Sequence, residues 1–263
     1  MADDLNTEAP LAVGTGKAQR LASLIVAMRW VWPVVTLALL AVAFIGLTKI
    51  SFDPSARQFF SEENPDRVAL DAFEAEFSKD DNVMIVLVPK DGDVFTPEML
   101  ALQGRITECA WQLPYVRRVN SLTNFQNTSA EGDDMLVRDL VPDLPYGAQQ
   151  PGAACDLASV DASAVSPETA AAAREIATSR VELVNSMTSA TGHVAQVQVL
   201  FKLPQVDKAV EVPTVVREAF VLRDAIEAAY PNVDVKLSGS TVINNQLLVS
   251  GAEDGSTLTP AMF

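Results

Sequence analysis

The sequence predicts an α+β fold, in which one N-terminal transmembrane helix precedes a split βαβ, ferredoxin-like domain that carries an insertion. Three observations lead to this prediction. Residues 30–48 form an uncharged apolar stretch, strand and helix patterns alternate after it, and a segment at about 124–190 interrupts that alternation. The 263 residues are enough for one or two domains.

The apolar stretch is bracketed by charge. Val31–Leu47 holds no charged residue and lies between Arg29 and Lys49. Taken as residues 30–48 it comprises 19 positions, within the range of about 17–25 that spans a bilayer. A cleaved signal peptide has a shorter apolar core, and a buried core helix is rarely apolar on every face. We therefore expect a transmembrane helix over residues 30–48.

Basic residues precede this stretch. By the positive-inside rule, Lys17, Arg20 and Arg29 place residues 1–29 in the cytoplasm and residues 49–254 outside it, at an inner, cytoplasmic membrane. Apolar residues at helical spacing within 20–29 predict a short helix on the inner membrane surface. Alternatively, residues 20–29 extend the spanning helix, with a kink at Pro33. The sequence leaves both open.

The first half of the outer region reads as helix, strand, helix, strand. Asn64-Pro65, Thr96-Pro97 and Ser166-Pro167 are helix-start signals, because a capping side chain precedes a proline suited to the first turn. The first two predict the helices at Asp66–Phe77 and from Thr96 to Pro114. The run Asn82–Val88 predicts a strand buried on both faces, and Tyr115–Thr123 a second strand.

The second half begins with an interruption. Residues 124–165 are rich in proline, glycine and asparagine, and we expect an irregular insertion. The elements expected after it are a helix from Ser166 to about Ser179, a hairpin of Leu183–Ser189 with His193–Leu203, a helix at Val212–Tyr230, a strand at Val233–Leu237 and a helix at Thr241–Val249. Without the insertion the order is strand, helix, strand, twice over, which is the split βαβ arrangement of a ferredoxin-like sandwich.

Charge and cysteine content exclude some classes of protein. Residues 51–263 hold 31 acidic and 15 basic residues, a net charge of −16. Such a domain repels phosphate backbones, so we expect no nucleic-acid partner. Cys109 and Cys155 fit neither a metal-binding spacing nor a Cys-x-x-Cys pair. They can form a disulfide in an oxidising compartment, but the sequence does not show whether they meet.

No motif of an enzyme or of a metal site is present. His193 is the only histidine and has no nucleophile elbow beside it. Asp80-Asp81 and Asp133-Asp134 do not continue into a calcium-loop pattern. We expect no catalytic residue, no cofactor and no metal, and we expect that the protein is not an enzyme.

An ordered series of segments resembles a known family. The series comprises Phe59-Phe60 and Asn64-Pro65 after the apolar stretch, the helix Asp71–Phe77, the strand from Asn82, Val94–Ile106, Leu113–Phe125, the turn at Gly192 and Leu237–Leu247. Over residues 20–263 this order resembles the first extracytoplasmic segment of the resistance-nodulation-division (RND) superfamily, in its hydrophobe-exporter and MMPL-like branch.

The resemblance implies a function. It implies the N-terminal part of a proton-driven exporter, whose ferredoxin-like porter domain helps to move hydrophobic or lipidic molecules outward. The implied partners are the lipid bilayer, that substrate, and the remaining transporter helices or another subunit. Residues 255–263 are then the truncated start of a second spanning helix. Phe59 and Phe60 are candidate contacts to the membrane surface or the substrate path. The alternative is a single-pass, membrane-anchored periplasmic domain that binds a partner protein.

Overall fold

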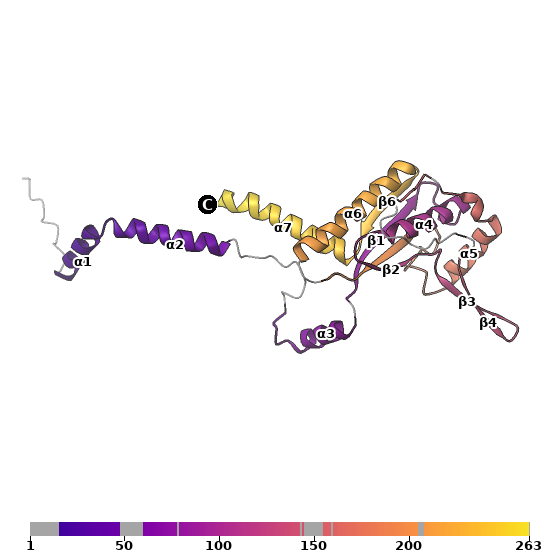
Figure 1. The fold of residues 1–263 in the computed structure, drawn as a ribbon, viewed down its shortest axis with the longest axis horizontal. Helices are drawn as coiled ribbons and strands as arrows, with labels where there is room; N and C mark the ends of the chain where they lie inside the picture. Colours follow the sequence, from indigo (N-terminus) through magenta and orange to yellow (C-terminus); the bar gives the residue numbers. More distant parts are fainter. Residues whose placement is uncertain are drawn as a thin grey trace, which may run out of the picture. The chain divides into compact units, whose positions relative to one another are not determined.

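The computed structural model describes residues 16–47, 60–77, 79–142, 144, 155–158, 160–204 and 208–262. The chain divides into two compact units, Met1–Phe52 and Asp53–Phe263. Each unit is described by itself below (Figure 1).

The first unit contains two helices and the second unit contains the rest. The helices of the first unit are α1 (Gly16–Ala27) and α2 (Val31–Leu47). The elements of the second unit are α3 (Pro65–Glu76), β1 (Asp81–Pro89), α4 (Pro97–Ala110), β2 (Val116–Asn120), β3 (Gln126–Glu131), β4 (Asp134–Asp139), η2 (Ala162–Ala164), α5 (Pro167–Ser179), β5 (Ala195–Phe201), α6 (Lys208–Ala229), β6 (Val233–Ser238) and α7 (Ser240–Met262).

The predicted transmembrane helix over residues 30–48 is corrected by the structure. In the described part of the chain, no helix is both long and apolar enough to cross a membrane. The helix found in that stretch, α2, has 17 residues. At about 1.5 Å per residue it is about 25 Å long, less than the hydrocarbon core of about 30 Å. The predicted fold class was therefore wrong in this respect.

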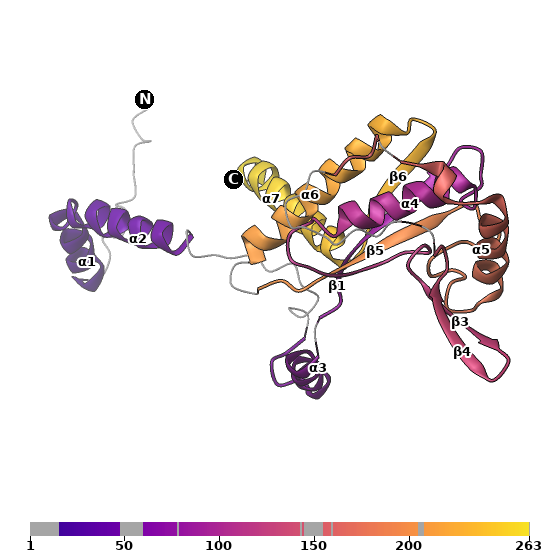
Figure 2. The same ribbon diagram turned by 45° about the vertical axis from the view of Figure 1, so that its right-hand side comes forward.

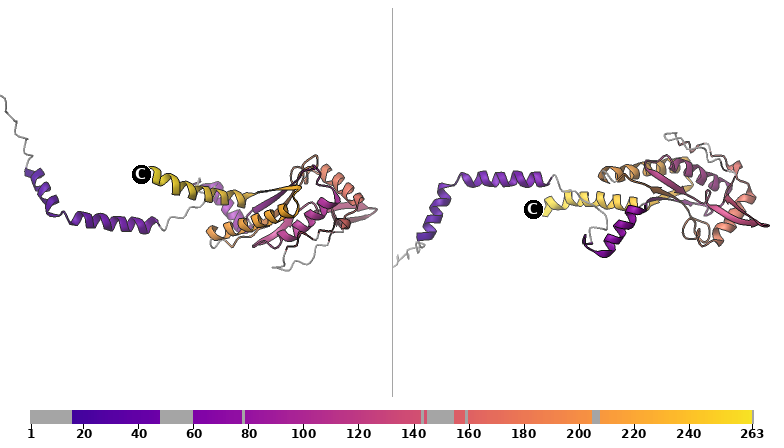
Figure 3. Two further views of the ribbon diagram at one scale, coloured as in Figure 1. Left: turned by 90° about the horizontal axis from the view of Figure 1, so that it is seen from above. Right: turned by 60° about the horizontal axis from the view of Figure 1, so that its bottom comes forward.

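A turn at residues 28–30 separates α1 from α2 (Figure 3). The N–H groups of Val31 and Trp32 both donate to the carbonyl oxygen of Met28, at 2.8 and 3.3 Å. Pro33 lies in the first turn of α2, where a missing N–H group costs little. The chain therefore forms two helices, and the alternative of one helix kinked at Pro33 is wrong.

The second unit is built on a four-stranded antiparallel sheet with the strand order β2-β5-β1-β6. In β1, Ile85 lies opposite Val197 of β5 and Leu237 of β6. Along the chain, β1-α4-β2 is followed by β5-α6-β6, so each half is one βαβ unit and the two interleave. The unit is therefore α+β.

Helices α4 and α6 lie side by side across one face of the sheet (Figure 2). Beneath them, alternate strand residues such as Val83, Ile85 and Leu87 are fully buried, together with Ile106 of α4 and Ile226 of α6. A second cluster of buried residues joins the first turns of α4 to α5 and to the segment around Leu140. Since α4 and α6 cover this face, the opposite face of the sheet is free of these two helices.

Three local predictions differ from the structure. β1 is not buried on both faces, because its residues alternate between buried and half-buried. The insertion is not irregular throughout, because β3 and β4 form a two-stranded sheet that projects from the body (Figure 1). The expected hairpin partner of β5 forms only isolated bridges, at Val184–Thr188 and Thr188–Ala195.

Candidate functional site

The open face of the sheet is the face opposite helices α4 and α6. The register places Met84 opposite Gln198 and Val86 opposite Gln196 on the β5 side. On the β6 side, Val86 lies opposite Lys236 and Val88 opposite Asp234. The half-buried side chains of Met84, Val86 and Val88 therefore form an apolar stripe along the central strand β1, with polar residues on both sides. We call this the open-face stripe.

The polar border of the stripe is ordered by its own hydrogen bonds. The Nδ2 group of Asn120 donates to Oε1 of Gln198 at 3.3 Å, across β2 and β5. The side-chain amide of Gln196 donates to the carbonyl oxygen of Ser186, and its backbone N–H donates to that of Met187 at 2.9 Å. With their amides held in place, these residues give the face a fixed pattern of apolar and polar groups.

A small pocket of about 250 Å³ lies beside the stripe. Val86 and Gln196 line it from the sheet, and residues 185–189 line it from the preceding loop. Asn185 has a φ of 61°, in the left-handed region where asparagine is among the favoured residues. The Thr188 hydroxyl donates to the carbonyl oxygen of Val194 at 2.9 Å and fixes the loop against β5. No charged side chain lines the pocket in the described part of the chain, so it suits neutral or apolar groups.

A second apolar surface is presented by α3. Leu70, Phe73 and Phe77 lie three and four positions apart, on one side of the helix, and are 46%, 57% and 58% exposed. The rings of Phe73 and Phe77 are 4.7 Å apart. Residues 60–77 hold six acidic residues and one basic residue, so this stripe has strongly negative surroundings. We call it the α3 stripe.

The candidate residues Phe59 and Phe60 precede this helix. Phe59 lies outside the described residues. Phe60 is 54% exposed, and its carbonyl oxygen accepts a 2.8 Å hydrogen bond from Nη1 of Arg67. This bond ties the backbone of Phe60 to the first turns of α3.

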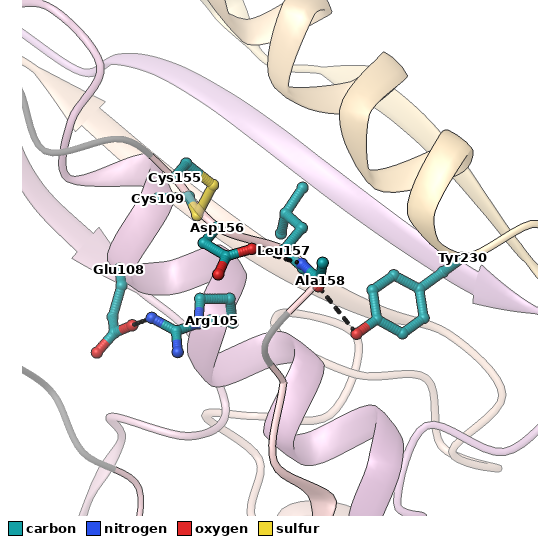
Figure 4. The surroundings of a disulfide bond; sticks show 8 residues. All are labelled: Arg105, Glu108, Cys109, Cys155, Asp156, Leu157, Ala158 and Tyr230. Carbon is teal, nitrogen blue, oxygen red and sulfur yellow. Dashed lines mark hydrogen bonds and ion pairs between the residues drawn. A yellow bond between two sulfur atoms is a disulfide. The ribbon is translucent and has the colours of Figure 1, made fainter.

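Cys109 of α4 and Cys155 are joined in a disulfide (Figure 4). The bond holds residues 155–158 against α4, with Leu157 buried in the core. The Tyr230 hydroxyl donates to the carbonyl oxygen of Leu157 at 3.1 Å, which ties the same segment to the end of α6. Burial, and next the nearby charge of Glu98, raise the pKa of Tyr230. The sequence showed neither the disulfide nor the hydrogen bond from Tyr230, because both join distant positions. The two cysteines are 46 positions apart.

The residues considered for chemistry make hydrogen bonds within the fold. Oγ of Ser189 accepts hydrogen bonds from the N–H groups of His193 and Val194, at 3.1 and 3.3 Å. Ser189 also lies 3.3 Å from Nδ1 of His193, but in the described part of the chain no carboxylate bonds to that ring. These hydrogen bonds of Ser189 hold the turn that precedes β5.

The acidic pairs do not converge on a metal position. Asp133 lies in the exposed turn between β3 and β4, and Asp80 lies just before β1. Among the residues with described positions, no group of three His, Cys, Asp or Glu side chains is arranged to hold a metal ion.

No model of a known protein family matches the chain, and no curated protein matches it. The resemblance to the RND superfamily therefore depends on the ordered series of sequence segments alone.

Proposed function

We propose that the second unit acts as a porter-type domain in a proton-driven RND exporter of hydrophobic or lipidic molecules, in the hydrophobe-exporter and MMPL-like branch. In this proposal the protein works at the inner membrane with this unit outside the cytoplasm. The proposal concerns the folded domain and does not depend on a membrane-spanning helix within residues 16–47.

The observation that carries the proposal is the open-face stripe. A domain that transfers apolar molecules needs an ordered surface with apolar side chains. These side chains must stay accessible to the transported molecule and not be permanently buried. Met84, Val86 and Val88 are half-buried on a rigid central strand, which meets both needs. Sheet sites also hold geometry better than loop sites do. The adjoining pocket adds a neutral recess of about 250 Å³.

The disulfide supports the proposed location. Disulfides persist in oxidising compartments such as the periplasm and are rare in the cytosol. The Cys109–Cys155 bond joins residues that are 46 positions apart and holds Leu157 in the core, so the domain is suited to a place outside the cytoplasm.

An export assay tests the proposal. The variant Met84→Gln/Val86→Thr makes the stripe polar while keeping side-chain size, and threonine retains a high strand propensity. In cells that carry the complete gene product, we expect export of a fluorescent hydrophobic probe to fall by about tenfold. Val221→Thr changes a residue of α6 that is 57% exposed and serves as the control. Unchanged export by the double variant at equal protein level would refute the proposal.

A second candidate function is the binding of a partner protein, and the α3 stripe favours it. Three exposed apolar side chains with acidic surroundings fit an apolar groove rimmed by basic residues. A photo-crosslinking amino acid at Phe73 should then capture a basic partner, whereas one at Val68, on the other side of α3, should not. Equal capture at both positions would count against this candidate.

A further inference from the structure

The bend between α1 and α2 forms an open apolar groove of about 790 Å³. Val26 and Arg29 line it from the end of α1 and the turn, and Trp32, Pro33, Leu37 and Leu40 line it from α2. Among the described residues that line the groove, Arg29 alone is charged. The groove thus combines an apolar floor with one cation at its mouth.

The exposure of the apolar side chains of α2 indicates that the groove binds an apolar partner. Every α2 side chain with a described exposure is exposed, and Leu37 and Leu40 are 72% and 61% exposed. Contiguous exposed apolar surface of this kind marks a binding site for a membrane or a protein.

The net charge of the two helices distinguishes between a membrane and a protein as the binding partner. Residues 16–47 hold three basic residues, Lys17, Arg20 and Arg29, and no acidic residue. Residues 48–263 hold 16 basic and 31 acidic residues, a net of −15. The two helices are thus the cationic part of an otherwise acidic chain, which matches an anionic surface. Trp30 lies in the turn and Trp32 follows it in the first turn of α2, and tryptophan is enriched at the level of lipid headgroups.

We infer that the α1–α2 groove is a binding site for an anionic phospholipid at a bilayer surface. Arg29 holds the phosphate of the headgroup, and the apolar floor from Val26 to Leu40 takes the upper part of an acyl chain. This site is independent of the proposed export function, which concerns the open-face stripe.

Tryptophan fluorescence of the full chain tests the inference. In a Trp111→Phe background the remaining tryptophans are Trp30 and Trp32, both at the bend. We expect their emission to shift to the blue with vesicles of phosphatidylcholine and phosphatidylglycerol, and much less with phosphatidylcholine alone. Inorganic phosphate should cause no shift. A shift with phosphate alone, or none with anionic vesicles, would overturn the inference.

Two pairs of matched variants locate the site. Arg29→Gln should raise the half-saturating lipid concentration about fivefold, as expected for one cation near an anionic surface. Arg217→Gln, on α6 with its side chain 67% exposed, should leave it unchanged. Leu37→Gln should weaken binding more than Val42→Gln, since Leu37 lines the groove and Val42, at 68% exposure, does not. Equal effects within either pair would show that the groove is not the site.

Discussion

Removal of the disulfide should destabilise the second unit strongly. The substitution Cys155→Ala removes the bond at an exposed position and leaves Cys109, which is 4% exposed, in place in the core. The two cysteines are 46 positions apart. Closing a loop of that length lowers the entropy of the unfolded chain by about 13 cal/mol/K, or about 4 kcal/mol at about 25 °C. Loss of the tether to Leu157 and Tyr230 adds to this cost.

Urea unfolding measures the effect. With a slope of about 2 kcal/mol/M, a loss of about 4 kcal/mol lowers the midpoint by about 2 M. Reduction of the unmodified protein should produce the same decrease, and Cys155→Ala should not respond to the reductant. If reduction lowers the stability of the unmodified protein by less than about 1 kcal/mol, the loop-closure reasoning is refuted.

Further predictions concern the ends of β1 and α6. Gly239→Ala should lower the free energy of unfolding by more than an unfavourable backbone conformation alone does, which is about 1–3 kcal/mol. The reason is that φ is 109° and that a Cβ atom would also lie 2.5 Å from the carbonyl oxygen of Asn82. Gly132→Ala, at φ 65° with open space around it, should show the backbone cost alone in the same urea titration. Ser240→Ala should cost about 1 kcal/mol, because Oγ of Ser240 accepts from the N–H of Asn82 at 3.1 Å. The pKa of Tyr230 is raised above its ordinary value of 10.0 in the folded protein. The contribution of this raised pKa to the free energy of unfolding is therefore complete below pH 10, and it is lost as the pH rises through the pKa of the folded state. Unfolding free energies from pH 9 to 11 should therefore fall less steeply in Tyr230→Phe, and equal slopes would contradict this.

The helix starts of the second unit could be predicted from local sequence. Oδ1 of Asn64 accepts from the N–H of Asp66 at 2.9 Å. The hydroxyls of Thr96 and Ser166 accept from N–H groups three positions on, at 3.2 and 3.1 Å. Such caps involve only neighbouring residues, so the sequence carries the complete signal. Strand β5 was equally clear, because its buried and half-buried residues alternate without a break.

Other features depend on information that is not local. The strands of the β3–β4 hairpin have no buried face, and Met135 and Val137 are 73% and 54% exposed, so no apolar period marks them. Gly132 was the sequence signal available for that turn, and its φ in the structure is 65°. For α2, the count of uncharged residues overestimated the length of the helix, because residue 30 lies in the turn that precedes it.

The candidate surfaces were only partly predictable. Phe60 was a candidate from sequence, and its hydrogen bond from Arg67 associates it with α3. The open-face stripe could not be predicted from the sequence, because strand β1 is apolar at six consecutive positions. Only the sheet register shows that Met84, Val86 and Val88 share the uncovered face. The pocket was also missed, since its loop residues 185–189 meet Val86 from a distant part of the chain.

Site-specific photo-crosslinking to a lipidic probe tests the proposed contact surface most directly. A photoreactive amino acid is placed in the full chain at Val86, on the open face, or at Val221, which is 57% exposed on α6. The chain is then illuminated with a labelled fatty amphiphile. We predict labelling at Val86 at least fivefold above that at Val221, with competition by an unlabelled amphiphile. Equal labelling at the two positions, or labelling at Val86 that no amphiphile displaces, would contradict a role of the open face in carrying hydrophobic molecules.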